Sequence, residues 1–175
     1  MRKSGVLMHI SSLPSPHGIG SMGKPARDFV DFLDKAGQAY WQILPVCPTS
    51  YGDSPYQSFS TFAGNPYFID LDELCKAGYL KRKEYAGIDW ESEPDRVNYE
   101  ALYNKRYVVL RKAAERFLEN PEDGYEEFCH DNKSWIYDYA LFMALKDANG
   151  GKSWLEWDEP CLLYTSDAAD DLIGV

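Results

Sequence analysis

One long, aromatic-rich stretch, residues 41–66 (WQILPVCPTSYGDSPYQSFSTFAGNP), constrains the fold of this chain more than any other. It begins as a short apolar run that Pro45 ends, and it continues as turn-forming residues interleaved with aromatic rings. This pattern predicts a buried strand followed by a long loop. Loops of this length are usually functional, because ordering so much irregular backbone is costly. Flat apolar rings beside short polar groups suit a sugar, which presents C–H groups on its faces and hydroxyls at its edges.

The segments before this loop have the pattern of one βαβ unit. Residues 4–10 (SGVLMHI) form an apolar run typical of a buried strand, and residues 11–23 carry the prolines and glycines of a loop. Residues 25–36 repeat apolar side chains at helical spacing, and residues 40–44 follow as a second strand. Such a unit implies a parallel sheet, in which ligands gather at the carboxyl ends of the strands. We therefore expect the loop of residues 11–23 and the long aromatic loop to share one face.

The remainder of the chain is mainly helical. Residues 67–71 are expected to form a short strand, residues 72–77 one or two helical turns, and residues 98–118 and 124–148 two longer helices. In the helix of residues 98–118 the sequence predicts a packed stripe of Leu102, Tyr103, Tyr107, Leu110, Ala114 and Phe117. It predicts a solvent-facing side of Lys105, Arg106, Arg111, Lys112, Glu115 and Arg116. Two or three strands neither close a barrel nor make a stable open sheet, so this α/β architecture is incomplete as given.

Charge and composition exclude several classes of partner. The chain has 175 residues and a net charge of −10, so it lacks the basic surface that neutralises phosphates in nucleic acids or anionic membranes. No apolar run approaches the roughly 20 residues needed to span a bilayer, and the apolar stretch at the N-terminus is short for a signal peptide. We therefore expect a cytoplasmic protein. The four cysteines are widely spaced, which predicts free thiols and neither a metal site nor a disulfide framework: Cys47, Cys75, Cys129 and Cys161.

The last fifteen residues abandon the pattern before them. Residues 161–170 (CLLYTSDAAD) look like the in-frame translation of a transposon-end adapter used in sequencing libraries. We therefore interpret residues 161–175 as a non-native tail and exclude them from the reasoning about the fold.

The authentic part of the chain resembles the 4-alpha-glucanotransferases called amylomaltases or disproportionating enzymes, glycoside hydrolase family 77. The matching pieces are SGVLMHISSLPSPHGIG from residue 4, FVDFLDKAGQAYWQILPVCPT from residue 29, YGDSPYQSFSTFAGNP from residue 51, and DYALFMALK from residue 138. The resemblance implies that residues 1–71 are the first βαβ unit of a (β/α)8 TIM barrel, with residues 45–66 as its substrate loop. It also implies that residues 72–160 form a mainly helical inserted subdomain.

The resemblance also implies the activity and its partners. Members of this family transfer alpha-1,4-glucan segments between maltooligosaccharides by a retaining mechanism, which needs two carboxyl groups about 5 Å apart and no cofactor. The family places these carboxyl groups on later strands, and no residue here matches those motifs. We therefore expect no catalytic residue in this chain, and no activity from the chain alone.

Sugar-binding residues are nevertheless expected in the long loop. By position, Ser54 and Tyr56 resemble the family's contacts to the sugar next to the scissile bond, and Tyr51 resembles an aromatic residue of a neighbouring or accessory site. His9 and Asp53 are candidate pocket-lining residues. Other interpretations stay open: Asp53 in its turn can bond the nearby backbone, His9 can be a structural histidine, and Tyr56 can pack within the loop.

Two other functions remain open at this stage. The chain could be a stand-alone alpha-glucan-binding module that uses the loop aromatics without catalysis. It could also be a helical interaction protein built on residues 98–148, which would leave the composition of the loop unexplained. A stand-alone module must contain a complete fold, whereas this sequence predicts one βαβ unit followed by helices.

Overall fold

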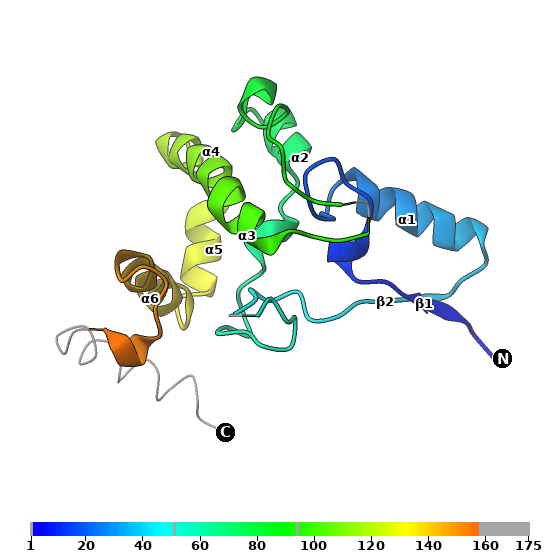
Figure 1. Cartoon of the computed structure of the whole chain (residues 1–175), viewed down its shortest axis with the longest axis horizontal. Helices are drawn as coiled ribbons and strands as arrows, with labels where there is room; N and C mark the ends of the chain where they lie inside the picture. The colour runs from blue at the N-terminus through cyan, green and yellow to red at the C-terminus, as the bar shows by residue number, and fades with distance from the viewer. Residues whose placement is uncertain (1, 51, 94, 158–175) are drawn as a thin grey trace. The chain divides into compact units, whose positions relative to one another are not determined.

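The computed structural model describes residues 2–50, 52–93 and 95–157. Within that part of the chain the backbone gathers into two compact units, the first ending at Glu122 and the second beginning at Asp123. Figure 1 traces the chain from blue at the start of the first unit to orange in the second. The sequence analysis divides the chain between residues 71 and 72, into a barrel part and an inserted subdomain. That division concerns the architecture of a whole barrel, so the two compact units do not test it and it stays a prediction.

A βαβ unit opens the first compact unit, as the sequence predicts. Strand β1 (Gly5–Leu7) pairs in parallel with strand β2 (Tyr40–Gln42), and helix α1 (Lys24–Lys35) connects them (Figure 1). Both strands are shorter than the predicted runs of residues 4–10 and 40–44. The reason is that each strand pairs with a single neighbour in the described structure, and the chain leaves the ladder soon afterwards.

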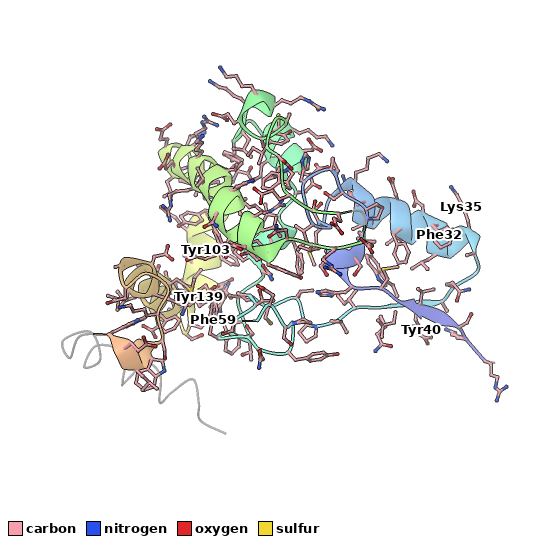
Figure 2. All side chains as sticks on the ribbon, in the orientation of Figure 1. Phe32, Lys35, Tyr40, Phe59, Tyr103 and Tyr139 are labelled. Atoms are coloured by element: carbon pink, nitrogen blue, oxygen red, sulfur yellow. The ribbon has the colours of Figure 1, made fainter. Side chains whose placement is uncertain are left out.

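The two faces of this small sheet differ in burial. On one face Trp41 packs against Phe29 of α1, with ring centroids 5.0 Å apart, and the indole Nε1–H donates to the carbonyl of Met8 over 2.7 Å. On the other face Leu7 and Tyr40 are 58% and 59% exposed, and Figure 2 labels Tyr40 at this open surface. Parallel sheets are usually covered on both faces. The residues described here therefore leave one apolar face of the sheet open.

Residues 67–71, predicted as a strand, form helical turns instead, so that prediction is wrong. A 3-10 helix, η2 (Pro66–Phe68), is followed by helix α2 (Leu71–Lys76), which matches the predicted turns at residues 72–77. The cause lies in Asn65, whose side-chain oxygen accepts a hydrogen bond from the amide of Tyr67 over 2.9 Å. This local bond offers the backbone an alternative to a strand ladder. Two further 3-10 turns complete the connections: η1 (Ile10–Ser12) and η3 (Arg82–Glu84).

The predicted helix of residues 98–118 is present and contains an irregular turn. It begins as α3 (Tyr99–Ala101), passes through a π-helical turn, η4 (Leu102–Arg106), and continues as α4 (Tyr107–Glu119) (Figure 1). The side-chain oxygen of Asn98 caps its start by accepting from an α3 amide over 3.0 Å. Asparagine is among the favoured residues at this capping position.

The buried stripe of this helix differs from the predicted one. Its buried residues are Ala101, Leu102, Arg106, Val109 and Ala113. The prediction that Arg106 faces solvent is wrong, because the side chain is 0% exposed, whereas Tyr103, predicted to be packed, is 54% exposed (Figure 2). The buried positions follow one another at spacings of four and three residues from Leu102, which brings position 106 onto the inner face. Hydrogen bonds to main-chain carbonyls satisfy part of its guanidinium there.

The core of the first unit joins this helix to the segments after the sheet. Its buried cluster consists of Ile10, Leu13, Ile19, Tyr67, Phe68, Leu71, Leu80, Tyr85, Trp90, Leu102, Val109 and Ala113. These residues come from the loop after β1, from η2 and α2, from the connection of residues 80–90, and from the long helix. The core therefore holds the loop of residues 11–23 against the end of the long aromatic loop.

The second unit contains two helices where the sequence predicts one at residues 124–148. Helix α5 (Tyr125–Asp131) and helix α6 (Ile136–Ala148) are followed by a short turn, η5 (Trp154–Glu156) (Figure 1). The break occurs because the side chain of Asn132 turns back, with its amide donating to the carbonyl of Phe128 over 2.8 Å. Asparagine competes with the helical backbone in this way, which favours helix ends.

Three further expectations concern the chain as a whole. No helix in the described residues is long and apolar enough to cross a membrane. Cys47, Cys75 and Cys129 are free thiols. Cys161 and the rest of the adapter-like tail, residues 161–175, lie outside the described residues.

Candidate functional site

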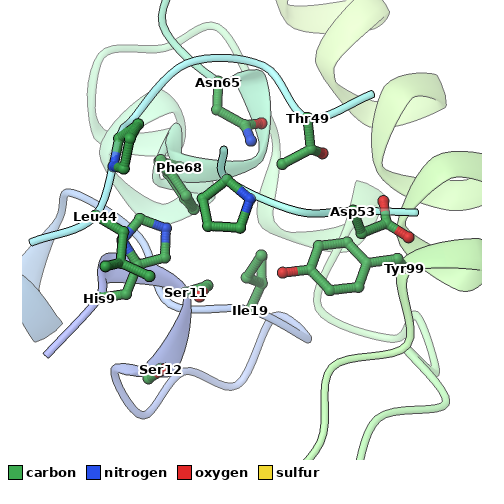
Figure 3. A pocket seen from close by; sticks show the side chains of 12 residues that line it. His9, Ser11, Ser12, Ile19, Leu44, Thr49, Asp53, Asn65, Phe68 and Tyr99 are labelled. Atoms are coloured by element: carbon green, nitrogen blue, oxygen red, sulfur yellow. The ribbon is translucent and has the colours of Figure 1, made fainter. Parts of the chain in front are cut away.

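The loops that follow the two strands meet at a cavity of about 140 Å³ (Figure 3). Its lining consists of His9, Ser11, Ser12, Ile19, Leu44, Pro45, Thr49, Asp53, Pro55, Asn65, Phe68 and Tyr99. Residues from both loops contribute, which confirms the expectation that the loops share one face. The structure thus brings together two of the sequence-predicted site residues, His9 and Asp53, in the lining of one cavity.

His9 lies in this lining with an unusual lack of partners. Its ring is buried and packs edge-on against Phe68, with centroids 5.3 Å apart (Figure 3). Burial lowers the pKa of the imidazole, which favours the neutral ring. Its Nδ1 is buried and has no hydrogen-bond partner among the described residues. Because buried polar atoms are normally hydrogen-bonded, this nitrogen is an exception within the cavity lining.

Asp53 contributes a carboxylate on the opposite loop. Its backbone is left-handed, with φ of 56°, and its amide donates to the carbonyl of Ser50 over 3.1 Å. The bond to the nearby backbone is therefore made by the amide of Asp53, while its carboxylate has no hydrogen-bond partner among the described residues. Burial raises the pKa of this carboxyl group. A partly buried carboxylate of this kind can accept hydrogen bonds from the hydroxyls of a ligand.

Tyr99 is a lining residue that the sequence reasoning missed. It occupies the first position of α3, and its side chain lines the cavity together with Ser11 of the loop after β1. Burial raises the pKa of the Tyr99 hydroxyl, so the group remains a neutral donor and acceptor. The only signal in the sequence was its place directly after the helix-capping Asn98. Nothing in that pattern says which loop a tyrosine at a helix start will face.

Tyr56 and Ser54 lie in the long loop, outside the cavity lining. The ring of Tyr56 is 72% exposed, so in the described structure it does not pack within the loop. The Ser54 hydroxyl accepts from the amide of Tyr56 over 3.3 Å, and the carbonyl of Ser54 accepts from the amide of Gln57 over 3.0 Å. These local bonds fix the turn that presents the ring. Tyr51, the third predicted contact, lies outside the described residues.

The long loop is held at its neck and along its length by its own short polar groups. At the neck the amide of Asn65 donates to the carbonyl of Val46 over 2.8 Å, and farther in the amide of Ser50 donates to the carbonyl of Gln57 over 2.8 Å. Near its end the hydroxyl of Ser60 accepts from two backbone amides. Compact loops whose ends lie close together and that pack on their own side chains are often functional.

The described residues do not supply a metal site. No group of three or more histidine, cysteine, aspartate and glutamate side chains there could hold a metal ion. The chemistry that the cavity itself offers is hydrogen bonding from a neutral imidazole, a carboxylate and hydroxyls beside apolar walls.

Comparison with known proteins identifies the family of this chain. The sequence profile of glycoside hydrolase family 77, described as 4-alpha-glucanotransferase, matches residues 8–172. The chain belongs to the 4-alpha-glucanotransferase family. The matched region runs past the start of the adapter-like tail, so the origin of that tail stays a prediction.

Individual relatives agree with this family assignment. A 4-alpha-glucanotransferase of Streptococcus pneumoniae is 51% identical over 159 residues, which cover 90% of this chain and 32% of the relative. One from Thermus thermophilus is 48% identical over 163 residues, covering 91% of this chain and 32% of the relative. The chain therefore spans about a third of the length of these family members.

A solved structure shares the fold as well as the sequence. Amylomaltase from Streptococcus agalactiae, determined in complex with acarbose, superposes with a TM-score of 0.84 at 41% sequence identity. The match covers 98% of this chain and 37% of that protein. The described arrangement of strands, loops and helices is thus a part of the amylomaltase architecture.

Proposed function

We propose that the chain supplies the N-terminal third of an enzyme that transfers alpha-1,4-glucan segments between maltooligosaccharides by a retaining mechanism. The observation that carries this proposal is the cavity at the ends of β1 and β2. It combines the imidazole of His9 and the carboxylate of Asp53, neither of which has a side-chain hydrogen bond within the part of the chain that the structure describes, with apolar walls. Such a mixture of C–H surface and hydrogen-bonding groups suits a glucan. The acarbose complex of the solved relative supports a sugar ligand for that relative, and we extend it to this chain.

Within that enzyme the chain binds and orients the sugar. Retaining transfer needs two carboxyl groups about 5 to 5.5 Å apart, and the family resemblance places them on strands beyond this chain. Here the exposed ring of Tyr56 stacks on the sugar next to the scissile bond, and Ser54 holds the turn that presents it. Tyr51 would take up glucan at a neighbouring or accessory site. His9 and Asp53 accept or donate hydrogen bonds at the floor of the same groove.

The finer points of fold and location follow the same proposal. Residues 1–71 are the first βαβ unit of a (β/α)8 barrel, and residues 72–160 are a helical insertion. The chemistry requires no cofactor, because carboxyl groups alone supply the nucleophile and the acid. With a net charge of −10 we expect neither nucleic acid nor membrane as a partner, and we place the enzyme in the cytoplasm.

The alternative of a stand-alone glucan-binding module is less well supported. Such a module needs a complete fold, whereas the two described strands leave Leu7 and Tyr40 exposed on one face of the sheet. An open apolar face on a parallel sheet favours a larger barrel that covers it.

The role of Tyr56 can be tested in a joined enzyme. We define the joined enzyme as residues 1–157 followed by the part of the Streptococcus pneumoniae relative that lies beyond the matched segment. In it, Tyr56→Ala should lower kcat/KM for maltotriose by roughly tenfold to a hundredfold, because a desolvated aromatic contact contributes about 1 to 3 kcal/mol. Tyr56→Phe should be mild, because it keeps the ring. Steady-state kinetics on maltotriose and amylose measures both.

Two further variants make this test specific. Tyr137 on α6 is 61% exposed, similar to Tyr56, and Tyr137→Ala should leave kcat/KM unchanged within about twofold, as expected for a surface position. Tyr51→Ala should weaken binding of amylose while turnover of maltotriose stays nearly intact. If Tyr51→Ala and Tyr56→Ala have equal effects on both substrates, the loop acts only as packing, and the proposed contacts are wrong.

A further inference from the structure

Arg106 is the most deeply buried charged side chain in the described residues, and its partners are unusual. It is 0% exposed, and its hydrogen bonds there go to two main-chain carbonyls. Nη1 donates to the carbonyl of His17 over 3.0 Å, and Nη2 donates to the carbonyl of Ile69 over 2.7 Å. Its Nε is buried without a partner among the described residues, and its guanidinium carbon lies 5.8 Å from the centroid of the Trp90 ring. No carboxylate within ion-pairing distance neutralises the guanidinium in that part of the chain.

Such a burial is costly unless the residue has a positional role. A buried charge without an ion-pair partner loses its hydration, and here burial lowers the pKa of the Arg106 guanidinium to about 10. An apolar residue at the same position of the stripe would fill the core without that loss. The π-helical turn that ends at Arg106 is also a local departure from a regular helix, and such turns occur often at functional sites.

The two carbonyls belong to two segments that each contribute residues to the cavity lining, although His17 and Ile69 do not line it themselves. His17 lies in the segment after β1 that gives Ser11 and Ile19 to the lining. Ile69 directly follows Phe68, which lines the cavity and packs on the ring of His9. One guanidinium therefore ties together two segments that are distant in the sequence and adjacent at the site.

Trp90 strengthens the same connection from the other side. Gly18 has a left-handed φ of 80°, and a Cβ atom there would lie 2.7 Å from the Cβ of Trp90. The buried Trp90 thus covers the turn beside His17 while its ring faces Arg106. Arg106 and Trp90 therefore both pack against the turn at His17 and Gly18.

We propose that Arg106 is a positioning residue of the sugar cavity, which fixes two of the segments that line it relative to each other by binding the carbonyls of His17 and Ile69. The proposal rests on the function proposed above. It predicts that replacing Arg106 lowers kcat/KM even where the protein remains folded, because small displacements of binding groups greatly slow catalysis. Arg106 acts through the backbone of the two segments and does not itself touch the sugar.

Arg116 provides a matched control within the same unit. Its Nη1 donates to the carbonyl of Tyr79 over 2.9 Å, and its guanidinium binds both carboxylate oxygens of Glu84 over 2.6 and 2.8 Å. None of these three residues lines the cavity. Arg116 therefore also joins distant segments through a main-chain carbonyl, but away from the site.

The test compares Arg106→Met and Arg116→Met in the joined enzyme, at a temperature where both variants retain their far-UV circular dichroism. Arg106→Met should lower kcat/KM for maltotriose by roughly tenfold to a hundredfold, as expected for misplaced binding groups. Arg116→Met should stay within about twofold of the unmodified joined enzyme, as expected for a residue away from the site. Amide hydrogen exchange should become faster in residues 13–20 and 66–70 for the first variant only.

Milder variants keep the test decisive if the methionine variant does not fold. Lysine is a compact donor that cannot bridge two carbonyls in a fixed fork, so Arg106→Lys should lose about three- to tenfold in kcat/KM, while Arg116→Lys should not. Equal kinetics for the Arg106 and Arg116 variants, or unchanged exchange in residues 13–20, would overturn the proposal. If the unmodified joined enzyme folds but shows no transferase activity, the proposed function itself fails, which is a separate outcome.

Discussion

The chain alone should release no glucose from maltotriose, whereas the joined enzyme should release it readily. In the first displacement of retaining transfer a carboxylate attacks the anomeric carbon while a carboxylic acid about 5 to 5.5 Å away protonates the departing oxygen. In the second displacement that acid, now a carboxylate, takes the proton of the acceptor hydroxyl, which displaces the enzyme carboxylate. The cavity described here holds a single carboxylate, that of Asp53, and its other polar groups are an imidazole, hydroxyls and an amide. Binding groups without this pair do not cleave a glycosidic bond. Glucose release, followed by a coupled assay and by chromatography of the longer products, measures both samples.

Two controls give this comparison its meaning. A heat-denatured sample of the chain sets the background for glucose release. An equimolar mixture of the chain and the separate remainder of the Streptococcus pneumoniae relative shows whether covalent joining is needed. Transfer products from the chain alone would show that a carboxylate pair exists within it and would contradict the proposed division of roles. A joined enzyme that is folded yet inactive would count against the proposed function.

The local parts of the fold could be predicted because they depend on local sequence. Two apolar runs separated by one amphipathic segment predict β1, α1 and β2, and this unit forms. The same unit places the loops after both strands at one edge of the sheet, and His9 and Asp53, both predicted as pocket lining, lie in the cavity there. The helix of residues 98–118 also follows from its pattern and its capping Asn98.

The errors arose where a side chain finds its partner far away or changes the backbone beside it. A charged residue in a helix usually points to solvent, so the sequence predicts Arg106 on the exposed side. In the structure its side chain is in the core, where it donates hydrogen bonds to the carbonyls of His17 and Ile69. The sequence predicts a strand after Asn65, but its side-chain oxygen accepts a hydrogen bond from the amide of Tyr67 and a 3-10 helix forms there instead. Tyr99 lines the cavity because distant segments pack together there, and the periodicity of a sequence does not predict such packing.

Gly20→Ala should be the most damaging single methyl addition to the cavity wall. A Cβ atom at Gly20 would lie 1.9 Å from the carbonyl oxygen of Ile10 and 2.8 Å from the amide nitrogen of Leu13. Both obstacles are backbone atoms, so no side-chain rotation relieves the clash, and the segment beside Ile19 must move. Overpacking of this kind typically costs about 1 to 3 kcal/mol and occasionally more. In the joined enzyme we expect a clear fall in the temperature of half-inactivation, and loss of maltotriose transfer even below that temperature.

Gly64→Ala separates this steric effect from the general effect of replacing a glycine. Gly64 lies near the end of the other loop, the long aromatic one, and no atom lies within 4 Å of the position its Cβ would take. Its substitution should therefore change stability by no more than about 0.5 kcal/mol and leave the half-inactivation temperature nearly unchanged. The contrast depends on the contact between the turn at Gly20 and the carbonyl of Ile10, the residue after His9. If both alanine variants inactivate at the same temperature with the same transfer rate, that contact does not shape the cavity wall, and the described packing of the loop after β1 is wrong.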